Sequence, residues 1–126
     1  MDDASLAAFF DSRPPAAFSH VVCTLGPSAG VGSILGADGL SGLRKQFDLK
    51  FFAQMAVVAH AAPKTADGGA VVVTTGALAK RPGKGSTALA AANGALEARW
   101  AAGFEGFTDA DGYQPAACLR HTAARR

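Results

Sequence analysis

The chain has 126 residues, of which 49% are hydrophobic and 17% charged, and its formal net charge is +2. A chain of this length forms at most one domain, and this balance excludes an intrinsically disordered protein. The basic residues are few and scattered, which argues against a nucleic-acid-binding protein. The longest apolar run, residues 51–62, contains Gln54 and His60 and is shorter than a bilayer span, so we expect no membrane segment.

The N-terminus and the cysteines indicate a cytoplasmic protein. The first five residues, Met-Asp-Asp-Ala-Ser, are acidic where a secretory signal peptide would be basic. Cys23 and Cys118 show neither CxxC spacing nor clustering with a histidine, so we expect no metal site. Two unpaired thiols are typical of a reducing compartment.

The first half of the chain alternates helix and strand. Asp2 or Asp3 can cap a short helix, which Arg13-Pro14-Pro15 ends. Residues 18–25 predict a buried strand, and a glycine-rich loop follows through Gly39.

A long apolar helix over residues 40–62 is the central predicted element. Its apolar residues recur at three- and four-residue steps and predict one continuous apolar face: Leu40, Leu43, Phe47, Phe51, Met55 and Val58. Asp67-Gly68-Gly69 predicts a turn, and the β-branched residues of 70–75 predict a short buried strand.

The second half contributes one more helix and an irregular tail. A loop over residues 80–85 leads to Ser86 or Thr87, either of which can cap an alanine-rich helix from Ala88 to about Arg99. The tail, residues 100–126, has no Val or Ile and predicts no strand. The order α-β-α-β-α over residues 1–99 predicts an α/β domain with three layers and parallel strands.

Four segments, in this order, resemble the middle of a short-chain dehydrogenase/reductase. They are residues 21–26 (Val-Val-Cys-Thr-Leu-Gly), the long helix, residues 68–76 (Gly-Gly-Ala-Val-Val-Val-Thr-Thr-Gly) and residues 92–98 (Ala-Asn-Gly-Ala-Leu-Glu-Ala). The resemblance covers roughly residues 2–97. It implies an incomplete Rossmann-like three-layer sandwich, with a few parallel strands and flanking helices. It also implies an NAD or NADP cofactor and hydride transfer to or from a carbonyl or alcohol.

The resemblance assigns site residues position by position. In the family, the long helix carries a catalytic Asn, the next strand ends in a catalytic Ser, and the following helix holds a Tyr-x-x-x-Lys pair. Lys50 stands in the place of the Asn, and Gly76 in the place of the Ser, with Thr75 as the nearest hydroxyl. Leu89 replaces the Tyr, and Asn93 replaces the Lys.

These positions give the candidate catalytic and cofactor-binding residues. A divergent branch of the family resembles this chain in its Leu…Asn-Gly-Ala-Leu-Glu-Ala pattern and in the basic residue of the long helix. Leu89 cannot transfer a proton, so we expect no turnover by this chain alone. For Lys50 the alternative is an ordinary surface lysine. The candidate catalytic residues are Lys50, Thr75 and Asn93, and the candidate cofactor-binding residues are Thr24, Gly26 and Asn93.

Two further parts of the family's pattern are missing from the sequence. The family begins with a strand, a glycine-rich turn and a helix that bind the cofactor pyrophosphate, and it continues after this region with a sixth and a seventh strand. A truncated or frame-shifted coding region is our hypothesis for both differences. We therefore expect this chain to bind NAD or NADP poorly or not at all.

Two glycine-rich segments offer alternative interpretations. Gly26 to Gly32 fits Gly-x-x-x-Gly-x-Gly and is an alternative cofactor turn, although the spacings of Lys50 to Pro63 and Gly76 to Asn93 favour the later position in the family. Residues 83–87 (Gly-Lys-Gly-Ser-Thr) resemble a phosphate loop but lack its spacing, so we interpret them as a helix cap.

A second function is open. Two apolar helices, residues 40–62 and 86–99, predict a non-catalytic module that self-associates into a homo-oligomer, because the strands that would cover their other faces are missing.

Overall fold

The structure is a computed structural model that describes residues 2–27, 35–37, 39–101, 107–109 and 116–121, with side chains through Ala98. Its helices are α1 (Asp3–Asp11), α2 (Gly39–Phe47), α3 (Ala53–Ala61) and α4 (Thr87–Ala101), and a π-helical turn, Asp48–Phe52, joins α2 to α3. Short 3₁₀ turns lie at Ala62–Lys64 and Ala77–Ala79. The strands are β1 (Phe18–Cys23), β2 (Thr65–Thr74), β3 (Phe107–Asp109) and β4 (Ala116–His121).

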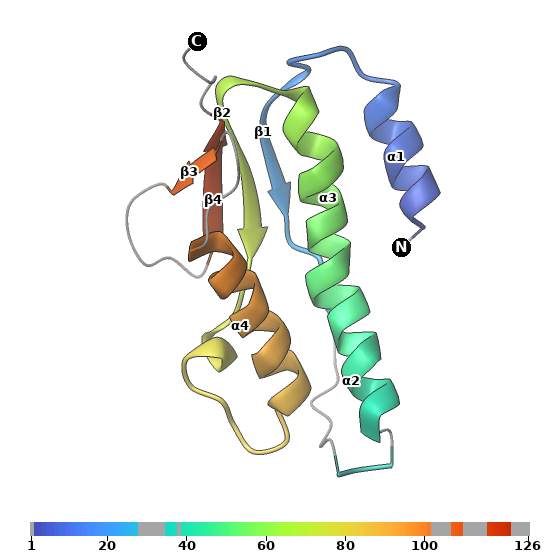
Figure 1. The fold of residues 1–126 in the computed structure, drawn as a ribbon, viewed down its shortest axis with the longest axis vertical. Helices are drawn as coiled ribbons and strands as arrows, with labels where there is room; N and C mark the ends of the chain where they lie inside the picture. Colours follow the sequence, from blue (N-terminus) through green and yellow to red (C-terminus); the bar gives the residue numbers. More distant parts are fainter. Residues whose placement is uncertain (1, 28–34, 38, 102–106, 110–115, 122–126) are drawn as a thin grey trace.

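The strands form one mixed sheet in the order β1-β2-β4-β3. β1 and β2 are parallel, β4 runs antiparallel to β2, and β3 runs antiparallel to β4 (Figure 1). The helix between β1 and β2 gives the β-α-β unit on which the sequence prediction depended. The chain is therefore a partial α/β fold of Rossmann-like type, as predicted. Among the described residues, α3 is the helix that packs on β1 and β2, and no helix forms the predicted third layer on the other face.

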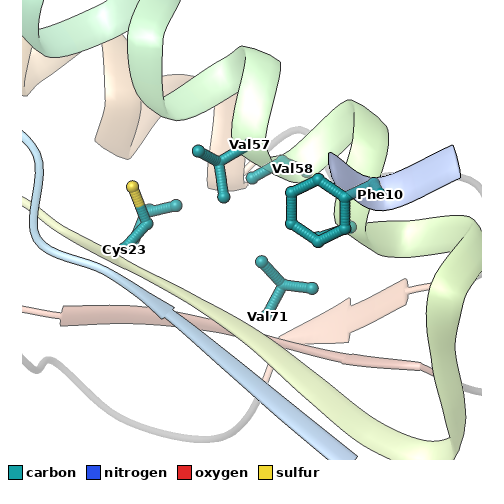
Figure 2. Packing of buried hydrophobic residues seen from close by; sticks show 7 residues of the cluster. Phe10, Cys23, Val57, Val58 and Val71 are labelled. Carbon is teal, nitrogen blue, oxygen red and sulfur yellow. The ribbon is translucent and has the colours of Figure 1, made fainter. Parts of the chain in front are cut away.

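The core lies between α3, α1 and the sheet. Val57 and Val58 of α3 pack toward Val71 of β2 and Cys23 of β1, and Phe10 of α1 closes one end (Figure 2). α1 begins where the sequence predicts, because the Asp2 carboxylate accepts hydrogen bonds from the backbone N–H groups of Ala4 and Ser5 at 3.2 Å each.

The buried face of the long helix agrees with the predicted apolar stripe in part, since Val58 lies in the core and Met55 packs against it. The buried residues of α3 are Gln54, Val57, Val58 and Ala61, whereas Leu40 of the predicted stripe is 60% exposed. Hydrogen bonds in the π-helical turn span five residues and rotate the side chains of α3, which follow it, relative to an α-helical pattern, so Gln54, Val57 and Ala61 join the buried face. Leu40 precedes the turn, which therefore does not account for its exposure.

β1 is shorter and less buried than predicted. It ends at Cys23, and Ser19, His20 and Val22 are exposed, with Val22 65% exposed. β1 is an edge strand, and in the described part of the chain no helix covers the face on which Val22 lies.

β2 begins earlier than predicted and contains the predicted turn. Phe18 pairs with Thr65 but His20 pairs with Ala70, so Asp67-Gly68-Gly69 forms an irregularity within the strand rather than a turn before it. Gly68 has a φ of +75°, which favours glycine. A Cβ atom at Gly69 would collide with the carbonyl oxygen of Ser19.

The prediction of a tail without strands is wrong, because β3 and β4 lie in it. The backbone of residues 116–120 pairs with β2 through main-chain hydrogen bonds, which do not depend on Val or Ile content. Among the described residues, no helix is both long enough and apolar enough to cross a membrane.

Candidate functional site

A pocket lies where the carboxyl ends of β1 and β2 meet the π-helical turn and α4. Its volume is about 250 Å³, and its lining consists of Thr24, Gly26, Pro27, Lys50, Thr75, Gly76, Leu78, Leu89 and Asn93. In open α/β sheets, ligands bind beyond the carboxyl ends of parallel strands, so this is the expected position for a site. Every sequence-predicted site residue lines this pocket.

Lys50 lies inside the molecule. Only 8% of it is exposed, so its interpretation as a surface lysine is wrong. Its Nζ donates a hydrogen bond to the carbonyl oxygen of Leu25 at 3.3 Å. A Cβ atom at Gly26 would lie 3.1 Å from Cδ and 3.2 Å from Nζ of Lys50, so the glycine provides space for the lysine.

The π-helical turn is the local cause of this orientation. Residues 48–52 form the turn, and Lys50 is its buried residue. π-helical turns within α-helices are frequently found at functional sites, because the extra residue directs side chains differently from a regular helix.

Gln54 is the site residue that sequence reasoning missed. It is fully buried, and its Nε2 donates to the carbonyl oxygens of Leu25 at 2.7 Å and Thr74 at 2.9 Å. Its Oε1 accepts from the backbone N–H of Thr74 at 3.0 Å. Gln54 therefore links the end of β2 to the segment after β1. The sequence contains one signal for this role, because Gln54 is a polar residue within the apolar run 51–62.

Asn93 of α4 closes the pocket on the side of β2. It is 2% exposed, and a Cβ atom at Gly76 would lie 3.1 Å from its Nδ2. Its Oδ1 is buried and has no hydrogen-bond partner within the described part of the chain. A buried acceptor without a partner is costly, so this atom is a candidate contact for a bound ligand.

Thr75 is held by a polar network beside the pocket. Its hydroxyl donates to Oε1 of Glu97 at 3.4 Å, and Nζ of Lys80 forms an ion pair with Oε2 of the same carboxylate at 2.9 Å. Glu97 and Lys80 do not line the pocket, and the hydroxyl of Thr75 joins their ion pair to it.

The charges in the site are set by burial. Burial lowers the pKa of Lys50, an effect that the nearby Cys23 thiol partly opposes. Burial also raises the pKa of Cys23, against the opposing effects of a backbone hydrogen bond from Leu25 and of Lys50. The thiol is therefore neutral near pH 7, and it is not a counter-charge for the lysine.

The two glycine-rich segments have different outcomes. Most of the Gly26–Gly32 segment lies outside the described residues, so the alternative cofactor turn stays a prediction. Ser86 precedes α4, its carbonyl accepts from the N–H of Ala90 at 2.8 Å, and its hydroxyl donates to the carbonyl of Gly83 at 2.6 Å. Residues 83–87 thus lead into the helix as predicted. Over the described residues, no three His, Cys, Asp or Glu side chains gather in a metal-binding group.

Comparison with known proteins shows which solved structures the chain is similar to. No protein-family model and no curated protein matches the chain. Among solved structures, a small-chain dehydrogenase in complex with NADPH matches with a TM-score of 0.68 and 26% identity, over 78% of this chain and 43% of that one. A structure of a small-chain dehydrogenase matches equally well and is covered to 51% of its length. This chain therefore spans about half the length of the proteins it matches.

The fold and the position of the pocket define the class, a partial Rossmann-like α/β protein. Within that class the chain is similar to small-chain dehydrogenases over about half of their length. At the positions that the resemblance assigns to the Tyr and Lys of the short-chain dehydrogenase/reductases, the chain has Leu89 and Asn93.

Proposed function

We propose that this chain is a degenerate part of an NAD(P)-dependent oxidoreductase of the short-chain dehydrogenase type. The observation that carries the proposal is the pocket itself, because it gathers Lys50, Thr75 and Asn93 at the carboxyl ends of two parallel strands. A nicotinamide nucleotide, when bound, supplies or accepts a hydride. The pocket would hold its nicotinamide and ribose end.

The residues present fit this part of a nucleotide. Gly26 and Gly76 lack the Cβ atoms that would project against Lys50 and Asn93. The unpartnered Oδ1 of Asn93 can accept a hydrogen bond from a ribose hydroxyl or a carboxamide N–H. A volume of about 250 Å³ is at the lower end of ligand-binding pockets and suits a fragment rather than a whole dinucleotide.

Proton transfer is the step that the pocket supports least. Leu89 has no ionisable group, and Lys50 is the one titratable residue among those that line the described pocket. We therefore propose that this chain by itself does not catalyse hydride transfer. The expected result is no oxidation of NADPH above background in the presence of aldehydes and ketones.

Nuclear magnetic resonance with two nucleosides tests the binding proposal. Reduced nicotinamide riboside should shift the backbone amide signals of Gly26, Gly76 and Asn93, with a Kd of about 1 mM or weaker. Adenosine should not shift them, because the pocket is proposed to hold the nicotinamide end. Equal effects of the two nucleosides, or none from either, would contradict the proposal.

A pair of glycine variants serves as the control. Gly76→Val should abolish the riboside shifts, because a side chain there would project into Asn93. Gly83→Val should leave them unchanged, since nothing lies within 4 Å of the corresponding Cβ position. Tight, saturable binding of NADPH would instead support the Gly26–Gly32 segment as a cofactor turn.

The second candidate function is self-association, and exposed apolar side chains favour it. Leu49 and Phe52 of the π-helical turn and Leu40 of α2 are large, apolar and exposed. We propose that residues 40–62 and 86–99 form the contact between two copies. Light scattering of the purified chain tests this: a discrete dimer supports it, and a monodisperse monomer contradicts it.

A further inference from the structure

The pocket contains a buried cation that has no anionic partner among the described residues. Lys50 is more than nine-tenths buried, and an ammonium group has three N–H donors. Among the described residues, Nζ of Lys50 donates to one acceptor, the carbonyl oxygen of Leu25 at 3.3 Å. Buried charges in proteins are normally paired, so this arrangement favours an anion supplied from outside.

None of the charged or ionisable groups described near the pocket serves as the anionic partner of Lys50. Glu97 is the carboxylate nearest the site in the described network, but it is paired with Lys80 and accepts from Thr75. Asp48, in the same turn as Lys50, is exposed and lines a different hollow beside α1. Cys23 is a neutral thiol for the reason given above.

A second polar atom in the same pocket independently points to a ligand. Oδ1 of Asn93 is a buried acceptor without a partner, and Asn93 is 2% exposed. An acceptor of this kind requires a donor, such as a hydroxyl group. The remaining walls include the apolar side chains of Pro27, Leu78 and Leu89, which suit a short hydrocarbon chain.

We infer that the pocket binds a small hydroxy acid, with Lys50 donating to the carboxylate and Asn93 accepting from the hydroxyl. The volume of about 250 Å³ restricts this ligand to a few carbon atoms. The inference goes beyond the proposed function, because Oδ1 of Asn93 accepts either from the hydroxyl of the acid or from the nicotinamide riboside, so the two ligands compete for one pocket. The binding itself needs no cofactor.

The test is a titration of the full chain, observed at the backbone amides of Gly26 and Gly76. The probes are 3-hydroxybutyrate and two compounds that each lack one group, its uncharged methyl ester and butyrate. We expect 3-hydroxybutyrate to bind at least about 10-fold more tightly than either of them. Sodium chloride at equal ionic strength controls for a general salt effect.

Two variants separate the two contacts. Lys50→Met keeps an unbranched apolar stem and should abolish the preference for the acid over the ester. Asn93→Leu should abolish the preference for 3-hydroxybutyrate over butyrate. Lys84→Met, which removes an exposed lysine, is the matched control and should change neither. The comparison of probes on the unmodified chain keeps the test decisive if a variant does not fold.

The outcomes distinguish this inference from the proposed function. If reduced nicotinamide riboside shifts the pocket amides but the acid binds no better than its ester, the hydroxy-acid inference is overturned and the proposed function stands. If the acid binds selectively but the riboside does not, the pocket is an anion site and the proposed function fails. If neither binds, both are wrong.

Discussion

At the scale of single residues, Gln54 shows how one polar side chain organises the site. Its three hydrogen bonds to Leu25 and Thr74 hold the ends of two parallel strands in a fixed relation. No role for this residue can be predicted from the sequence, because a lone glutamine in an apolar helix indicates a polar position but not its hydrogen-bond partners. Lys50 was identified through its alignment with a family position, but its burial depends on the π-helical turn.

Replacement of Gln54 by leucine should destabilise the chain strongly. Gln54→Leu leaves the N–H and carbonyl groups of Thr74 without these partners inside the protein, and we expect a loss of about 2–4 kcal/mol in the free energy of unfolding. Urea denaturation followed by circular dichroism measures it. Ala59→Leu, at an exposed position of the same helix, should change the value by about 0.5 kcal/mol or less. Similar values for both variants would show that Gln54 is not a structural link.

The stability of the chain should depend on pH through Lys50. Burial lowers the pKa of this amine below its ordinary value of 10.5, so the unfolded chain binds more protons than the folded chain between the lowered pKa and 10.5. The contribution of Lys50 to stability therefore rises with pH across this window. Near neutral pH the buried charge costs stability.

The variant Lys50→Met isolates this contribution. Between about pH 7 and about pH 10, the unmodified chain should gain stability relative to Lys50→Met in urea denaturation. The comparison is needed because Cys23, whose pKa is raised, changes stability in the opposite direction: its contribution falls as pH rises above the unfolded value. Parallel pH profiles of the two proteins would contradict the assignment.

At the scale of the elements, periodicity predicts that the helices exist but not how they pack. The spacing of apolar residues predicts the helical run 40–62 correctly, and Asp2 predicts where α1 begins. The π-helical turn is invisible to this pattern, so the predicted buried face includes Val58 but omits Gln54, Val57 and Ala61. β4 was missed because its pairing with β2 is made by main-chain groups, on which composition carries little information.

The irregularity in β2 predicts that Gly69 cannot gain a side chain without a loss of stability, and Gly94 of α4 serves for comparison. Gly69→Ala should destabilise the chain by about 1–3 kcal/mol, because the added Cβ would collide with the carbonyl oxygen of Ser19 and approach Cγ2 of Thr65 to 2.8 Å. Gly94→Ala is the matched change in the interior of α4, where nothing lies within 4 Å, and should stabilise by about 0.5–1 kcal/mol. Thermal unfolding of both variants measures the contrast, and a shift of the same sign in both would refute it.

At the scale of the whole molecule, the resemblance predicted which residues meet better than any local pattern. Thr24, Lys50, Thr75 and Asn93 lie on four different segments, and only the order of a known fold indicates that they share a pocket. The chemistry of that pocket was less predictable, because Leu89 and Asn93 depart from the family's pair. Without the Tyr and Lys of the family, the pocket contains the ammonium group of Lys50, the acceptor Oδ1 of Asn93 and apolar side chains.

Self-association can occur through two different exposed surfaces, and single substitutions can distinguish between them. Phe52 lies on the helical side and is 57% exposed, whereas Val22 lies on the edge strand β1 and is 65% exposed. An edge strand with an apolar exposed residue is a template for disordered aggregation, and charges on such strands prevent it. An exposed apolar helical face instead favours a defined contact between two copies.

The two variants Phe52→Glu and Val22→Lys should therefore act on different species. In light scattering over a range of concentrations, Phe52→Glu should remove a discrete dimer and leave slow aggregation on heating unchanged. Val22→Lys should delay aggregation on heating and leave the dimer intact. Val22→Lys should lower the free energy of unfolding of the monomer by no more than about 0.5 kcal/mol, since the position is exposed. Phe52→Glu should lower it by about 0.5–1.5 kcal/mol, because it also removes the edge-to-face contact with the ring of Phe51. If Val22→Lys removed the dimer instead, the sheet edge would be the contact between copies, and the helical faces would be free.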